Sequence, residues 1–236
     1  MSKTLNHLQP GRLFAAARQH FKKGCGPDDR RRGFKLMKQA AVQGHALAHE
    51  WLGALYDYGL GTRRNRFRSF EHYKIAADAG KPNSEYHVGV FYHDGIAVRK
   101  SYREAVRWLR KAAAHGDDTA AYWLGQCYLH GRGVPRNEEE GFRLMLVAAE
   151  KGVVDSQYSI GVCYEKGQGI LADSTKAFRW YLRAARRGYA DAAFSLEWMY
   201  ANGCGTAMNK QRAKFWGDRG NALQGREVAQ PSRNKE

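Results

Sequence analysis

Two histidines one helical turn apart are the first candidates for chemistry in this sequence. His45 and His49 would share one face of a helix, where both imidazoles could bind one metal ion. No acidic residue or cysteine converges with them, so we expect the pair to lie at a surface or an interface instead. Serine, histidine and aspartate residues are present, but none stands in a nucleophile-elbow context. The sequence therefore predicts a non-enzymatic protein with no catalytic residue, no metal and no cofactor.

A glycine-rich segment is the second candidate. Residues 121–135 read AYWLGQCYLHGRGVP and contain the pattern G-x-x-Y-x-x-G-x-G. A phosphate-binding loop of the dinucleotide type needs a strand before it and a helix after it. The residues before Gly131 instead place Leu124, Cys127 and Tyr128 at helical spacing, without a run of β-branched residues. The segment is therefore expected to be helical and not to bind a nucleotide.

The same pattern recurs with a period of 36 residues, which gives the glycines a structural role. The recurring positions are Gly53, Gly89, Gly125 and Gly161; Tyr56, Tyr92, Tyr128, Tyr164 and Tyr200; and Gly59, Gly95, Gly131, Gly167 and Gly203. An alanine pair and a closing glycine end each of the first five units, at Gly44, Gly80, Gly116, Gly152 and Gly188, whereas the last unit has Gly220 and Asn221 in place of the pair. A repeat array of this kind predicts a solenoid.

Each unit predicts two helices. The first is about 13 residues long, as in residues 118–130, and ends where Gly131 can adopt a left-handed conformation. The second helix follows an N-cap residue, and these caps share one register: Asn65, Ser101, Asn137, Asp173 and Asn209. Glycines in the middle of the first helices predict close helix contact, for which the alanine pairs are the expected partners. Glu197 replaces this glycine in the last unit, as expected of a polar terminal repeat.

The pattern A-x-x-x-L-G-x-x-Y-x-x-G-x-G-V-x-x-[DN], followed by A-x-x-W-x-x-x-A-A-x-x-G, resembles Sel1-like repeats (SLR), which are related to tetratricopeptide repeats. The match is closest at residues 120–135 and 177–188, whereas Ala97 replaces a loop glycine and His72 the tryptophan. This resemblance implies an all-α, right-handed superhelical α-solenoid of about six helix-turn-helix repeats. It also implies a scaffold or adaptor whose first helices line a concave groove.

The predicted boundaries follow the repeat. Residues 1–9 form an N-terminal extension, residues 10–224 the solenoid, and residues 225–236 a flexible polar tail. The units are 10–44, 45–80, 81–116, 117–152, 153–188 and 189–224. The first thirty residues contain no long apolar run, so we expect a soluble cytoplasmic protein without a membrane partner. Four cysteines are too few for a disulfide scaffold; Cys127 and Cys163 are expected in the core.

Charge is distributed unevenly between the helices. The chain has 39 Lys and Arg against 23 Asp and Glu, a net charge of +16. The five windows of first helices, 46–58 and every 36 residues onward, hold nine acidic residues and one basic residue, a sum of −8, so the rest carries +24. Basic residues on the second helices, such as Arg107, Arg143 and Arg179, would form an outer ladder. This outer face could steer an acidic partner protein or, as the alternative, bind nucleic acid.

Partner-binding residues are predicted by analogy with tetratricopeptide geometry. They are Asp57, Tyr86, His93, Tyr122, Gln126, Leu129, His130, Tyr158, Glu165, Phe194 and Trp198. An aromatic column along a groove suits a partner protein or peptide in extended or helical form. Packing between adjacent repeats is the alternative role for most of the tyrosines. We therefore give more weight to Asp57, His93, Glu165 and Trp198, which depart from the repeat.

Overall fold

The described part of the chain is entirely helical. The computed structural model describes the backbone of residues 9–229 and the side chains of residues 9–225, and these residues form twelve α-helices and no strand. The helices are α1 Pro10–Gln19, α2 Pro27–Val42, α3 Ala46–Tyr58, α4 Arg66–Asp78, α5 Pro82–Asp94, α6 Tyr102–Ala114, α7 Asp118–His130, α8 Glu138–Glu150, α9 Val154–Lys166, α10 Ser174–Arg186, α11 Ala190–Asn202 and α12 Lys210–Ala229. The all-α prediction is confirmed.

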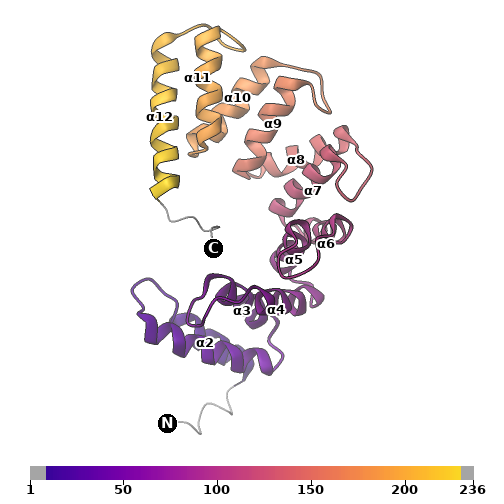
Figure 1. The fold of residues 1–236 in the computed structure, drawn as a ribbon, viewed down its shortest axis with the longest axis vertical. Helices are drawn as coiled ribbons and strands as arrows, with labels where there is room; N and C mark the ends of the chain where they lie inside the picture. Colours follow the sequence, from indigo (N-terminus) through magenta and orange to yellow (C-terminus); the bar gives the residue numbers. More distant parts are fainter. Residues whose placement is uncertain (1–8, 230–236) are drawn as a thin grey trace. The chain divides into compact units, whose positions relative to one another are not determined.

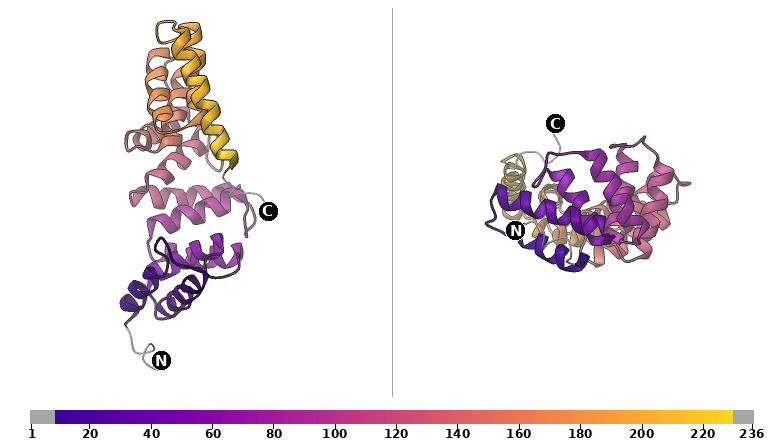
Figure 2. Two further views of the ribbon diagram at one scale, coloured as in Figure 1. Left: turned by 90° about the vertical axis from the view of Figure 1, so that its left-hand side faces the viewer. Right: turned by 90° about the horizontal axis from the view of Figure 1, so that it is seen from below.

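Two compact units divide the chain between Asp117 and Asp118. Unit 1 contains α1–α6 and unit 2 contains α7–α12 (Figure 1). Within each unit every helix packs against the next one along the chain, and Figure 2 shows α11 and α12 side by side in unit 2. This nearest-neighbour packing is the arrangement that a repeat array uses to bury its apolar faces.

The predicted helix ends are confirmed in detail. All five predicted N-cap side chains accept a hydrogen bond from the backbone N–H three residues later, as from Glu140 to Asn137 Oδ1 at 3.0 Å. All five predicted loop glycines have a positive φ, for example 66° at Gly131. Ala97, which replaces a loop glycine, has a φ of 60°, a strained value that costs an alanine about 1–2 kcal/mol. The loop geometry is thus kept even where the glycine is lost.

The mid-helix glycines do allow close contact, but the predicted partners were wrong. Each glycine lies beneath a large side chain of the second helix, and not beneath the alanine pair. A methyl group at Gly161 would lie 2.5 Å from the Tyr181 ring, and one at Gly53 would lie 2.7 Å from the Tyr73 ring. Leu109 and Met145 cover Gly89 and Gly125 in the same way. A large side chain fills the space over a glycine, where an alanine would leave a void.

The last repeat reverses this arrangement of large and small residues. Glu197 stands on α11 where α3, α5, α7 and α9 carry glycine, and Gly217 stands opposite it on α12. A methyl group at Gly217 would lie 2.5 Å from Glu197 Oε1, and one at Gly220 would lie 2.7 Å from the Phe194 ring. The Glu197 side chain is therefore accommodated within its own repeat, by Gly217 on the second helix.

The ends and the cysteines complete the comparison with the sequence. Helix α12 continues to Ala229, past the predicted end of the solenoid at residue 224, because no proline interrupts the chain before Pro231. Residues 1–8 and 230–236, with most of the predicted extension and tail, lie outside the described residues. Cys127 and Cys163 are each 1% exposed, as predicted, and no described cysteine forms a disulfide.

Candidate partner-binding site

A polar pocket in unit 2 collects several of the predicted binding residues. This α9 pocket is a cavity of about 400 Å³ lined by side chains from α7, α9, α10, α11 and the loop after α9. Its lining is Gln126, Leu129, His130, Tyr158, Ser159, Val162, Cys163, Glu165, Lys166, Gln168, Tyr181 and Ser195. Five of the eleven predicted residues therefore share one cavity: Gln126, Leu129, His130, Tyr158 and Glu165.

Hydrogen bonds connect α7 with α9 at one wall of the pocket. Gln126 Nε2 donates to Ser159 Oγ at 3.3 Å and also contacts Met145 Sδ at 3.3 Å. His130 Nε2 lies 3.2 Å from Gln126 Oε1, so it donates when that nitrogen carries the proton. Burial, followed by the charges of nearby arginines, lowers the pKa of His130. The wall therefore presents a neutral network of donors and acceptors.

An acidic side chain, Glu165, also lines the pocket. The Tyr181 hydroxyl donates to Glu165 Oε2 at 2.5 Å, although the Tyr181 side chain is only 1% exposed. Close packing of its ring over Gly161 carries the hydroxyl to the pocket. Burial and the hydrogen bond to Glu165 raise the pKa of Tyr181, so this hydroxyl remains a neutral donor. Glu165 is thereby held at the cavity as a fixed acceptor.

Tyr158 both packs between adjacent repeats and lines the pocket, the two roles that the sequence left open for the tyrosines. Its ring stacks on Tyr189, with centroids 4.8 Å apart, and lies 5.5 Å from the Tyr181 ring. It also lines the pocket, and burial raises its pKa. Packing between repeats and exposure to a ligand are thus compatible for this residue.

The other six predicted residues lie elsewhere. Phe194 packs over Gly220, and Trp198 is 52% exposed on α11. Tyr122 is half-buried and does not line the pocket, but its side chain is hydrogen-bonded to Ser159 and Gln126 of the pocket wall. In unit 1, Asp57 lies 3.9 Å from Arg64 and 3.7 Å from Arg66. The remaining two are Tyr86, half-buried beside His87, and His93, buried with Nδ1 2.6 Å from Asp94 Oδ1. Their role in binding a partner stays a prediction.

Comparison with known proteins places this geometry in a family. Residues 19–45, 46–81, 82–117, 119–153 and 154–189 each match the Sel1 repeat. The chain belongs to the Sel1 repeat family. No curated protein matches it. Sel1 repeat proteins are generally protein-interaction scaffolds, and the all-α architecture is that of a Sel1 repeat solenoid.

Two solved Sel1 repeat structures are similar over nearly the whole chain. A protective antigen of uropathogenic Escherichia coli strains with an SLR fold is 28% identical with a TM-score of 0.84, and the match covers 94% of this chain. It covers only 47% of the antigen, so the chain spans about half of that protein. A Sel1 repeat protein from Oxalobacter formigenes is 27% identical, with a TM-score of 0.81 and coverages of 92% and 84%.

A more distant structure supports the fold alone. An immunity protein from Pseudomonas aeruginosa is 22% identical with a TM-score of 0.55, and the match covers 91% of this chain and 81% of that protein. This similarity supports the helical repeat fold and indicates nothing about function.

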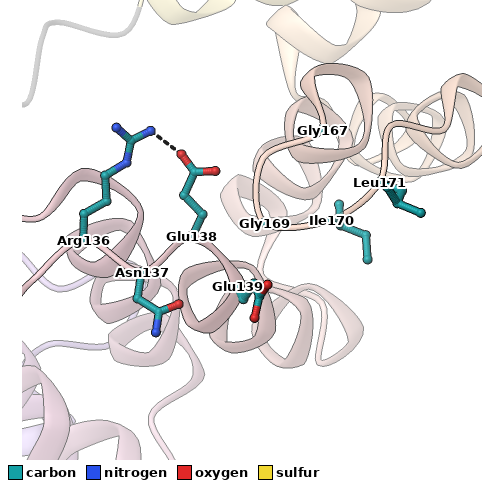
Figure 3. A pocket seen from close by; sticks show the side chains of 8 residues that line it. All are labelled: Arg136, Asn137, Glu138, Glu139, Gly167, Gly169, Ile170 and Leu171. Carbon is teal, nitrogen blue, oxygen red and sulfur yellow. Dashed lines mark hydrogen bonds and ion pairs between the residues drawn. The ribbon is translucent and has the colours of Figure 1, made fainter.

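Two further cavities of this Sel1 repeat protein lie where the loop of one repeat meets the N-terminal end of the preceding second helix. The unit 2 notch, shown in Figure 3, has a volume of about 810 Å³. It is lined by Arg136, Asn137, Glu138, Glu139, Gly167, Gly169, Ile170 and Leu171. The unit 1 notch has a volume of about 380 Å³ and is lined by Pro27, Arg30, Arg31, Gly59, Gly61, Thr62 and Arg63. Sequence reasoning identified neither notch as a site.

The predicted outer arginine ladder is exposed but partly paired. Arg143 donates to Glu140 at 2.7 Å, and Arg107 lies 3.5 Å from Glu104. Among the aromatic residues near the basic segments, Tyr73 and Trp108 are buried, whereas Phe67 is 68% exposed. Few of these rings are therefore presented for base stacking.

The two histidines lie at an interface, as expected. His45 Nδ1 accepts from the Ala48 N–H at 3.3 Å, and its ring stacks on Phe14. His49 Nδ1 lies 3.0 Å from His72 Nδ1. Nowhere among the described residues do three or more histidine, cysteine or acidic side chains group so that they could hold a metal ion. Within the same residues, no helix is both long and apolar enough to cross a membrane.

Proposed function

We propose that this Sel1 repeat protein is a non-enzymatic scaffold or adaptor that holds a segment of a partner protein in the α9 pocket. The observation that supports this most strongly is the convergence of five predicted binding residues on one cavity of unit 2. Amide, hydroxyl and carboxylate groups around a tyrosine ring match the donors and acceptors of a peptide backbone.

The pocket favours a short extended segment over a small apolar ligand. Ser159 and Ser195 occupy one register in successive repeats, so similar polar groups recur along the surface at the repeat spacing. A peptide backbone also presents polar groups at regular intervals, whereas a compact apolar ligand would leave these side chains unpaired. A cytoplasmic location is part of the proposal, because buried thiols without a disulfide suit a reducing compartment.

Affinity capture from the native organism, read by mass spectrometry, tests this function. The double variant Gln126→Ala with Ser159→Ala should reduce the amount of captured partner at least about tenfold, because hydrogen bonds at the centre of an interface carry much of its affinity. In the same assay, Trp198→Ala tests a predicted residue that does not line the pocket, and Tyr122→Ala removes a side chain that is hydrogen-bonded to Ser159 and Gln126 of the pocket wall.

Phe215→Ala is the control, because Phe215 is 55% exposed on α12 and does not line the pocket. Circular dichroism should show unchanged helical content in every variant. Capture that survives the pocket variant would exclude the α9 pocket. Tight RNA or DNA binding that weakens steeply as salt rises would instead favour the basic outer face.

A further inference from the structure

The two notches share one backbone geometry. Gly61 packs against the Arg30 carbonyl, and Gly169 packs against the Glu138 carbonyl, so that neither glycine leaves room for a methyl group. Positions 30 and 138 are three repeat periods apart, as are positions 61 and 169. The repeat therefore builds the same kind of cavity in both units.

Their side chains differ in charge. Arg30, Arg31 and Arg63 line the unit 1 notch. The equivalent positions in unit 2 are Glu138, Glu139 and Leu171. Because one backbone geometry accepts both sets, the fold does not require arginines at these positions. The three arginines of unit 1 therefore need an explanation other than folding.

Ion pairs within the chain neutralise only part of the positive charge of the unit 1 notch. Arg31 lies 3.7 Å from Asp28, and Asp57 engages Arg64 and Arg66 outside the notch. Arg30 and Arg63 are both exposed, and among the described residues no acidic group lies within ion-pair distance of either. Two guanidinium groups at one cavity thus lack an internal counter-charge.

We infer that the unit 1 notch binds an acidic segment of a protein partner, with Arg30 and Arg63 as the groups that contact its carboxylates. The planar guanidinium matches a carboxylate through two parallel hydrogen bonds. A cavity of about 380 Å³ has room for a few acidic side chains, not for a long charged strand. Its lining contains no aromatic ring on which a nucleic-acid base could stack, which favours polypeptide over single-stranded nucleic acid.

This surface is separate from the α9 pocket, because the two cavities share no residue and lie in different units. A second contact on the same chain would raise the avidity for one partner or allow two partners to be held together. Failure of the α9 pocket to bind a partner would therefore leave this inference untouched.

Fluorescence anisotropy with a short labelled peptide of alternating glutamate and serine, at physiological ionic strength, tests the inference in the full chain. Arg30→Glu with Arg63→Glu should weaken binding of this peptide at least about tenfold, since each reversal replaces attraction by repulsion. The same peptide with glutamine in place of glutamate should not bind.

Arg107→Glu with Arg179→Glu is the matched control. Both double variants lower the net charge of the chain from +16 by 4, to +12, but the control alters α6 and α10 and no residue of either notch. The control should change the dissociation constant by less than about twofold, because neither arginine lines the notch and salt screens exposed charges outside it. Glu138→Arg with Leu171→Arg should add a second peptide site, at the unit 2 notch.

The inference would be overturned if the wild-type chain did not bind the glutamate peptide, or if both double variants lost binding equally. It would also be overturned if Glu138→Arg with Leu171→Arg added no second site. A uridine oligonucleotide that binds more tightly than the peptide, and whose binding Arg30→Glu with Arg63→Glu abolishes, would overturn it in favour of nucleic acid. Circular dichroism and thermal melting of each variant show whether the fold is retained.

Discussion

At the scale of single residues, the repeat positions were predictable but their contacts were not. A period of 36 places Gly161 in the middle of a first helix and indicates that something approaches it closely. The period does not identify the side chain that does so, because this depends on how the second helix is rotated about its axis. Tyr181 fills that position, and its packing also sets where its hydroxyl meets Glu165.

For the site residues too, the position in the repeat could be predicted but the contacts could not. The registers of Gln126 and Tyr158 were predicted, and the structure places both at the α9 pocket. Ser159 and Ser195 were missed because a small polar side chain on a helix carries no distinct signal. Their register does change along the chain, from tryptophan or histidine in the second to fourth repeats to serine in the last two, and this change could have revealed them.

A prediction at this scale concerns Gly161→Ala. The added methyl group would lie 2.5 Å from the Tyr181 ring, so one of them must move. Overpacking of this kind should lower the free energy of unfolding by about 1–3 kcal/mol, measured by urea denaturation. Gly11→Ala is the control, because nothing lies within 4 Å of that position and its φ is not positive. It should leave the stability unchanged or raise it slightly, and an equal loss in both variants would contradict the proposed packing.

At the scale of helices, predictions that rest on local chemistry were the most accurate. Residues 118–130 were predicted as a helix, and α7 has those bounds. Caps and left-handed glycines act within a few residues, so the sequence contains nearly all the information that fixes them. Contacts between helices are different. The sequence placed His49 at a surface or an interface, but only the structure shows that it meets His72 on the next helix.

The α3–α4 interface therefore predicts a dependence of stability on pH. Burial, with the nearby charges of His49, Lys38 and Arg68, lowers the pKa of His72 to about 4, and burial also lowers the pKa of His49. His49 Nε2 lies 3.2 Å from the Ala41 carbonyl, so it carries the proton and leaves Nδ1 to accept from His72. Protonation of His49 at Nδ1 would remove this acceptor, so His72 would have to change tautomer to keep the hydrogen bond.

The sign follows from proton linkage. A histidine whose pKa is lowered by folding binds more protons in the unfolded chain, so stability should fall as pH decreases from about 6.5 toward 4. His72→Phe keeps an aromatic ring at the position that stacks on Tyr56 and removes one titrating group. Denaturation midpoints measured across this pH range should therefore fall less steeply for the variant. Parallel curves for variant and wild type would show that His72 does not contribute.

At the scale of the whole molecule, the repeat array and the family were predictable, whereas the choice of binding surfaces was not. The glycines, caps and core positions that the fold requires recur from repeat to repeat, so they can be recognised in the sequence. A binding surface is carried by positions that the repeat leaves free, such as Arg30 and Glu138 at equivalent notches. Such positions are recognised only when the structure shows which of them line one cavity.

The end of the array supplies a prediction for the chain as a whole. Helix α12 packs against α11, and Trp216 of α12 shares a buried cluster with Leu196, Met199 and Tyr200 of α11. A chain that ends at Asn209 lacks α12 and exposes this apolar face. Exposure of several large apolar side chains costs at least about 2 kcal/mol.

Hydrogen exchange measured by mass spectrometry should therefore show at least about tenfold faster exchange in α11 of this shortened chain. Helices α7 and α8 should change little, because each repeat is stabilised mainly by its neighbours. A chain that ends at Gln224 is the matched control, since it keeps the Trp216 contact, and its α11 should exchange like that of the full chain. Unchanged protection of α11 after removal of α12 would show that the last helix does not stabilise the array.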